Sequence, residues 1–150
     1  MKYIEILEQH LKCDFLVDLF ETYDVEVIYD YDRTYEGIED EYRASIPDMG
    51  LEFIFDQNQK LKTLFMDSVE HKGYNPFEGE DPRNSPLDTA QKAIQFAKEN
   101  SIILEHREKQ ESELFGHIPE WVKLTYKNYS VHYSYTKNGL KKAILQSTKA

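Results

Sequence analysis

The chain has 150 residues, which fits one domain over residues 1–150, and a hydrophobic content of 40% supports a globular fold rather than disorder. Its single cysteine excludes an internal disulfide, and the sequence shows no secretory signal and no apolar run long enough to span a bilayer, so a cytoplasmic location is expected. The formal net charge of −10 disfavours nucleic acid and anionic membrane as partners and favours a basic protein.

The charge is unevenly distributed along the chain. Residues 1–56 contain 16 acidic and four basic residues, whereas residues 121–150 contain six lysines and no acidic residue. Solubility alone would favour an acidic total, but it does not account for the asymmetry. Part of the asymmetry is expected to be internal, with the lysine-bearing C-terminal strands lying beside acidic ones.

The first third of the chain is predicted to form a helix and two strands. Apolar residues recur at helical spacing, which predicts one amphipathic helix, or two short ones, over residues 2–22. The segment 25–31 alternates and is rich in β-branched and aromatic residues, which is typical of a strand, and 42–46 is a candidate for a second strand. Residues 32–41 between them have the composition of an exposed loop.

A turn and a hairpin are predicted for the middle of the chain. Pro47 and Gly50 bound the turn, because proline presets its own φ and glycine accepts a positive φ. Strand patterns over 51–56 and 61–66 then predict an antiparallel hairpin. The next segment, 73–84, is a loop rich in glycine and proline.

A second helix and a β-meander are predicted for the rest of the chain. Ser85 is the expected N-cap and Pro86 the first helical residue of a helix that ends near Asn100. Strands are predicted over 102–106, 121–126, 131–135 and 142–145. Candidates for burial are Trp121, Leu124, Tyr126, Val131 and Ile144. This order predicts an α+β fold, an antiparallel sheet of about six to seven strands with the N-terminal helix and the mid-chain helix packed on it.

Few patterns in the sequence point to catalysis or metal binding. The five histidines lack zinc-ligand spacing, and Cys13 is interpreted as a helix thiol rather than a nucleophile. Asp48, followed by Glu70 and Lys72, resembles the Pro-Asp…Glu-x-Lys arrangement of magnesium-dependent nucleases, in which two acids hold the metal and the lysine supports attack on phosphate. Such a pattern also arises by chance in a highly charged chain. We therefore expect no enzyme activity, no metal and no cofactor.

Residues 21–42 are the predicted binding surface. They interleave five tyrosines with acidic residues and a single arginine. Tyrosine offers a large contact area at a low entropy cost, and carboxylates steer a basic partner. In the competing interpretation, Tyr29 and Tyr31 face the core and the acids form a solvated edge. The predicted partner-binding residues are Asp30, Tyr31, Asp32, Tyr35, Glu36, Glu39, Asp40 and Glu41.

Several segments together resemble a family of small bacterial immunity proteins that are encoded beside polymorphic toxins, including those of contact-dependent growth inhibition. The segments are Gly50-Leu-Glu-Phe-Ile-Phe-Asp56, Leu61-Lys-Thr-Leu-Phe65, Gly73-Tyr-Asn-Pro-Phe-Glu-Gly79, Phe115-Gly-His-Ile-Pro119 with Trp121-Val-Lys123, and Ser130-Val-His-Tyr133. The resemblance covers residues 40–146 and departs from the family after its second glycine, where Glu80-Asp-Pro82 replaces the usual Leu-Pro.

The resemblance implies a non-catalytic inhibitor that binds the C-terminal domain of a cognate toxin, often a nuclease, and protects the producing cell. It implies no particular binding residues. Combined with the acidic region, it predicts an immunity protein that occludes a basic active site. The alternatives are the magnesium-dependent nuclease with Asp48, Glu70 and Lys72, and a non-catalytic adaptor domain.

Overall fold

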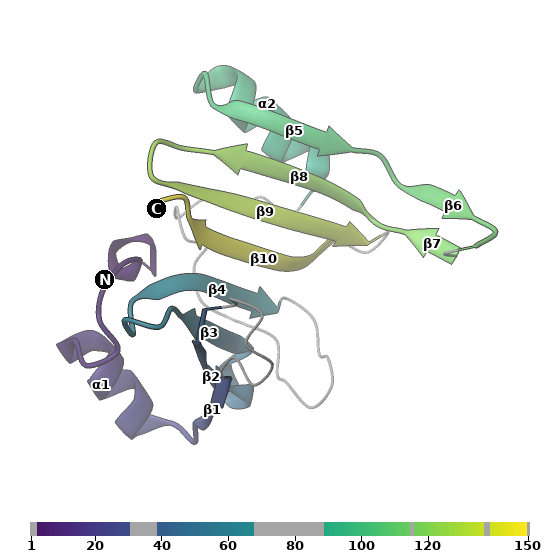
Figure 1. Cartoon of the computed structure of the whole chain (residues 1–150). Coiled ribbons are helices and arrows are strands. Elements are labelled where there is room, and N and C mark those ends of the chain that lie inside the picture. The colour runs from purple at the N-terminus through teal and green to yellow at the C-terminus, as the bar shows by residue number, and fades with distance from the viewer. Residues whose placement is uncertain (1–2, 31–38, 68–88, 115, 137–138, 150) are drawn as a thin grey trace.

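A computed structural model of the chain describes residues 3–30, 39–67, 89–114, 116–136 and 139–149 (Figure 1). Its helical elements are η1 (Tyr3–Ile6), α1 (Asp14–Thr22), η2 (Pro47–Met49) and α2 (Ala90–Glu99). Its strands are β1 (Glu26–Asp30), β2 (Glu41–Ile46), β3 (Leu51–Phe55), β4 (Leu61–Asp67), β5 (Ile103–Arg107), β6 (Gln110–Ser112), β7 (Gly116–Ile118), β8 (Glu120–Thr125), β9 (Tyr129–Thr136) and β10 (Gly139–Ser147).

Eight of the strands form one antiparallel sheet in the order β1-β2-β3-β4-β10-β9-β8-β5. The predicted α+β class, the hairpin of β3 and β4 and the meander of β8, β9 and β10 are confirmed. The sheet is larger than predicted, and a separate hairpin of β6 and β7 extends from it (Figure 1).

The helical elements agree with the predictions at the N-terminus but not at the start of α2. The N-terminal pattern forms two short pieces, η1 and α1, which is the second of the two predicted alternatives, and Glu8 between them has a φ of 68°. Helix α2 begins at Ala90, because the hydroxyl of Thr89 accepts a hydrogen bond from the Lys92 backbone N–H at 3.2 Å. The prediction of Ser85 as its N-cap was therefore wrong, and residues 85–86 lie outside the described part.

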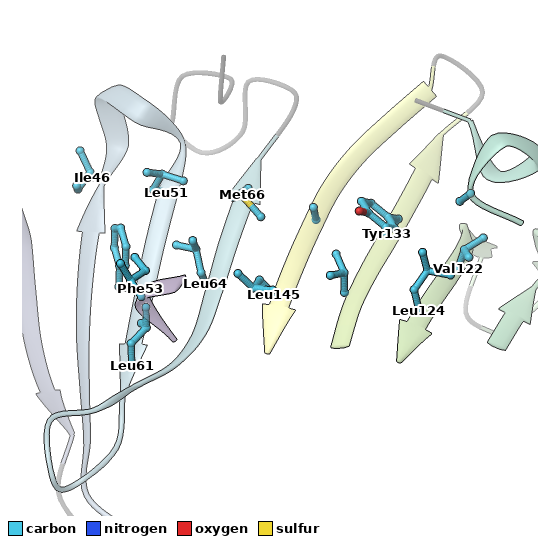
Figure 2. Packing of buried hydrophobic residues seen from close by; sticks show 14 of the residues in the cluster. Ile46, Leu51, Phe53, Leu61, Leu64, Met66, Val122, Leu124, Tyr133 and Leu145 are labelled. Atoms are coloured by element: carbon cyan, nitrogen blue, oxygen red, sulfur yellow. The ribbon is translucent and has the colours of Figure 1, made fainter. Parts of the chain in front are cut away.

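The core occupies one face of the large sheet. Cross-strand partners share a face, and the register aligns buried residues in rows from β2 to β8. One row consists of Ala44, Phe53, Leu64, Leu145, Val131 and Leu124. Figure 2 shows labelled buried side chains that extend across the sheet from Ile46 on β2 to Val122 and Leu124 on β8. The buried residues of β3, β8 and β10 alternate with less buried ones, and together the central strands form a single continuous core.

Helices α1 and α2 cover this core at separate places. Leu16 of α1 is fully buried, and the Phe20 ring meets the Phe53 ring edge-on with centroids 5.3 Å apart. Ala93 and Ala97 of α2 are buried where that helix packs against β8 and β5. Small residues let α2 lie close to the sheet, whereas α1 fills its space with large side chains.

The opposite face of the sheet is less completely buried. Of the residues predicted to be buried, Leu124 and Val131 are in the core, but Trp121, Tyr126 and Ile144 are only half-buried. Register places Trp121 and Ile144 on this second face, because alternate residues of a strand point to opposite sides.

The sheet consists of two halves with the same topology. Residues 3–67 form α1 followed by β1, β2, β3 and β4, and residues 89–149 form α2 followed by β5, β8, β9 and β10. The sheet order runs inward from each edge strand to the β4–β10 pair, which joins the halves. In chain order, the hairpin of β6 and β7 lies between β5 and β8.

Candidate functional site

Six acidic residues of the N-terminal half lie on or directly beside the edge strands β1 and β2. We define the acidic edge as Asp24, Glu26, Asp30, Glu39, Asp40 and Glu41. Strands β1 and β2 form this edge and pair along the length of β1. Glu26 lies opposite Ser45 at one end, and Asp30 lies opposite Glu41 at the other. Glu26 and Glu39 are exposed, and Asp40 and Glu41 are half-buried.

The structure brings half of the predicted binding residues to this edge. Asp30, Glu39, Asp40 and Glu41 lie at the ends of β1 and β2 that face residues 31–38 in the chain. The other predicted binding residues, Tyr31, Asp32, Tyr35 and Glu36, lie outside the described residues.

Arg43 partly compensates the negative charge of β2. Its guanidinium lies 3.2 Å from Glu41 and 3.2 Å from Glu52, which flank it on β2 and β3. All three side chains are partly exposed, so these pairs contribute at most about 1 kcal/mol each. Asp24, Glu26 and Glu39 take part in neither pair and are the exposed acidic residues of the edge.

Strand β1 also exposes apolar side chains. Val27 is 61% exposed and Ile28 is 53% exposed, although each lies in a regular antiparallel pair with β2. They lie on opposite faces of the strand, since successive side chains alternate. Phe53 of β3, which lies in the same register row as Val27, is fully buried, whereas Val27 at the edge is open to solvent.

Helix α1 extends the acidic surface. Asp14, Asp18 and Glu21 are exposed, whereas Leu16 on the same helix is fully buried. An amphipathic helix on a core has this arrangement for solubility alone. These acids therefore add charge near the edge without marking a contact point.

The predicted nuclease residues cannot be assembled from the described part of the chain. Asp48 lies in η2 and is exposed, whereas Glu70 and Lys72 lie outside the described residues. Within the described ranges, no group of three or more His, Cys, Asp or Glu residues has a geometry suited to a metal ion. Cys13 is a half-buried free thiol at the N-cap of α1.

A cleft lies at the base of the hairpin of β6 and β7, in the other half of the protein. Its volume is about 840 Å³, and it is lined by Glu108, Lys109, Glu111, His117, Glu120, Tyr135 and Thr136. His117 Nδ1 lies 2.9 Å from Glu111, and His106 Nε2 lies 2.8 Å from Glu120. Charges of both signs line this open cleft, so it does not select a ligand by charge as clearly as the acidic edge does.

Sequence reasoning missed this hairpin. Its strands have only three residues each, too few to show an alternating pattern. The available signal was Gly116, whose φ of 69° suits the glycine of a short hairpin turn.

A histidine on the second face of the sheet has an unusual environment. His132 stacks on Trp121 with ring centroids 5.0 Å apart, and its Nδ1 is buried without a hydrogen-bond partner. Burial lowers the pKa of His132, and the charge of Lys123 lowers it further, against a smaller opposing effect of a backbone hydrogen bond. The geometry makes His132 a neutral packing residue rather than a proton donor.

Comparison with known proteins adds no relative. The chain matches no protein-family model, no curated protein and no solved structure. Among the described residues, none of the helices is both long enough and apolar enough to cross a bilayer.

Proposed function

We propose that the chain is an immunity protein that binds the C-terminal domain of a cognate bacterial toxin in the cytoplasm and occludes a basic active site, most simply that of a nuclease. The observation that carries this proposal is the difference in charge between two halves of equal topology. Residues 3–67 contain 17 acidic and five basic residues, whereas residues 89–149 contain six acidic and ten basic residues. The shared architecture does not require this difference.

Inhibition by this surface needs no chemistry of its own. A nuclease grips phosphate groups with lysine and arginine, and carboxylates can occupy those cations in place of phosphate. Exposed carboxylates also accelerate encounter with a basic partner by electrostatic steering. Exposed apolar side chains on β1 would add contact area between these charges.

Charge reversal tests the proposal. The variant Asp24→Lys, Glu26→Lys, Glu39→Lys changes exposed residues at both ends of the β1–β2 ladder. The matched control, Glu105→Lys, Glu108→Lys, Glu113→Lys, makes the same change in net charge with exposed residues of the other half. The probe is the toxin domain encoded by the gene directly upstream, and binding is measured by calorimetry.

We expect the acidic-edge variant to weaken binding by about 100-fold or more, since close charge pairs couple by about 1.5–7 kcal/mol each. The control variant should lose far less affinity for the toxin domain. Association with the wild type should slow as salt rises, because exposed charges are screened beyond a Debye length of about 8 Å. If the control loses protection and the acidic-edge variant keeps it, the contact surface lies on the other half.

The nuclease alternative has its own test. Cleavage of DNA or RNA by the pure protein with Mg²⁺ or Mn²⁺, abolished by Glu70→Gln, would support an enzyme and contradict the inhibitor. An adaptor would instead bind no toxin and cleave no nucleic acid.

A further inference from the structure

Strand β1 is an open edge of the sheet. It pairs with β2 on one side, and the sheet order places no described strand on its other side. Along its length the register with β2 runs without a shift from Glu26 to Asp30. Half of its backbone N–H and C=O groups therefore point away from the sheet, in the regular spacing of a strand that can accept another.

β1 lacks several of the devices that usually prevent strand addition. Natural edges are blocked by shortness, by charged side chains (lysine above all), by proline, by a bulge or by a covering element. The five residues of β1 include neither lysine nor proline, and its pairing shows no bulge. Val27 and Ile28 are exposed on opposite faces, so no described element covers either of them. Within the described part of the chain, the edge is open both in its backbone and in its apolar side chains.

Charge decides which kind of strand β1 can accept. Glu26 and Asp30 stand at its two ends, and Asp24 and Glu39 lie beside it. A second copy of β1 would bring acidic residues together, which is unfavourable for cross-strand pairs, whereas a strand with basic residues would gain opposite-charge pairs. The charge of β1 therefore disfavours pairing with a second copy of β1 and favours pairing with a strand that carries basic residues.

The other edge of the sheet provides a comparison within the same molecule. β5 is also open on one side, and Ile103 is 68% exposed. Its residues Glu105 and Arg107 have opposite charges, so β5 selects no partner by charge. The two edges therefore share backbone geometry and an exposed isoleucine but differ in electrostatic selectivity.

We propose that β1 is the docking site for an extended basic strand of the partner protein, which adds to the sheet beside β1. The added strand would present a basic residue opposite Glu26 and apolar residues opposite Val27 and Ile28. Main-chain hydrogen bonds contribute affinity and the side chains contribute specificity. The proposal rests on the proposed function in one respect, that the partner is the toxin domain.

Hydrogen exchange of the full-length chain reads out strand addition directly. Outward N–H groups of residues 26–30 should exchange quickly in the free protein and slowly once the toxin domain encoded upstream is bound. Residues 103–107 of the other edge should keep their exchange rates.

Proline variants supply an independent measurement. Adjacent residues of a strand direct their N–H groups to opposite sides, so one of Val27→Pro and Ile28→Pro removes an outward N–H and keeps the bonds to β2. The variant that retains the wild-type melting temperature should have an affinity for the toxin domain that is lower by about tenfold or more. The corresponding member of the pair Ile103→Pro and Leu104→Pro at β5 should bind normally.

The outcomes separate the two proposals. If the toxin domain binds and residues 26–30 exchange at the free rate, strand addition is wrong and the inhibitor proposal survives. If the toxin domain does not bind, the inhibitor proposal fails, and a peptide of alternating lysine and valine decides the remaining question. Protection of residues 26–30 by this peptide, absent with a twin that carries a central proline, supports strand addition. Protection by both peptides or by neither overturns it.

Discussion

The two halves of the sheet have the same order of elements and opposite charge. Each half places one helix over the apolar face and presents four antiparallel strands, of which the last joins the other half. The buried positions are correspondingly alike, as Phe53 in β3 and Val131 in β9 show. Eight of the 14 acidic residues of 3–67 whose exposure is described lie at exposed positions, where the architecture does not need them. Comparison of the halves thus separates what the fold requires from what is available for recognition.

The halves also differ in what stabilises their ends. In the N-terminal half, the Glu8 carboxylate accepts hydrogen bonds from Lys62 at 2.6 Å and from Ser147 at 2.5 Å, and it thereby ties the N-terminal segment to β4 and β10. In the C-terminal half, Thr89 caps α2 and His132 packs on Trp121. Substitutions at these places test whether the halves are independent. A substitution at the β4–β10 pair that joins the halves, here called the seam, tests the same point.

The seam substitution should have the largest effect. Leu64 on β4 lies opposite Leu145 on β10, and both side chains are fully buried. Leu64→Ala should lower the free energy of unfolding by about 2–5 kcal/mol through lost burial and a residual cavity. Because the core is continuous, urea unfolding followed by circular dichroism should remain one transition. Two transitions, one for each half, would mean that the seam does not couple them. Leu104→Ala, at a half-buried position on β5, is the milder comparison.

Much of the fold was predictable from the sequence, because local patterns control the central strands. The alternation in Leu51–Phe55 is a local signal, and the strand predicted there was confirmed, as was the antiparallel pairing of β9 with β10. The start of α2 was misplaced because Ser85 and Thr89 are both good caps, and only tertiary structure decides between them. Burial of Trp121 was overestimated because alternation does not tell which face carries the core.

The candidate site was less predictable than the fold. The charge imbalance was visible in the sequence, but the openness of β1 depends on the sheet order, which joins β4 to β10 rather than to β1. No local signal gives such a long-range pairing. The cleft beside β6 and β7 was missed for the same reason, since Glu108 and Thr136 meet only in three dimensions.

Glu8 provides the next prediction, for the acidic half. Partial burial tends to raise its pKa, but hydrogen bonds from Lys62 and Ser147 and the charges of Lys62 and Lys60 outweigh this, so its pKa lies below the ordinary value of 4.5. Glu8→Gln should lower the free energy of unfolding by about 1–3 kcal/mol at neutral pH. The wild-type contribution is present above the ordinary pKa and is lost as the pH falls through the lowered pKa.

Urea unfolding at neutral pH and at an acidic pH below the lowered pKa measures this effect. The two proteins should have similar stability in acid, where the Glu8 carboxylate is protonated. Glu5→Gln, at an exposed position of η1, is the matched control. A Glu8→Gln effect that is the same at both pH values would show that packing, not charge, is lost.

A smaller effect is expected at the start of α2, in the other half. Thr89→Ala removes the hydroxyl that accepts the Lys92 N–H, and the loss should be about 1 kcal/mol. Thr89→Ser keeps the acceptor and should remain near the wild type in thermal unfolding. If serine and alanine are equally destabilising, the cap contributes little. Toxin binding should be unchanged in both variants, because α2 lies in the half opposite the acidic edge.

The smallest effect at neutral pH is expected for His132→Phe. Phenylalanine can retain the stack on Trp121, and it removes a buried Nδ1 that has no hydrogen-bond partner, so stability should change by less than about 1 kcal/mol. The difference should emerge in acid. Because the folded-state pKa is lowered, first by burial and then by Lys123, the unfolded chain binds the proton more tightly. The wild type therefore loses stability as the pH falls from the ordinary value of 6.5 through the lowered pKa.

The phenylalanine variant should consequently melt above the wild type at about pH 5 and near it at neutral pH, a reversal that steric effects alone cannot produce. Lys123→Gln, which removes the neighbouring charge but keeps His132, should recover only part of this difference, since burial is the larger cause. If the melting temperatures of His132→Phe and the wild type differ by the same amount at both pH values, protonation of this residue is ruled out as the cause. The loss of stability due to His132 should begin as the pH falls below the ordinary value of 6.5, whereas the loss due to Glu8 should begin only below the ordinary value of 4.5, so the two onsets should be separable on one pH scale.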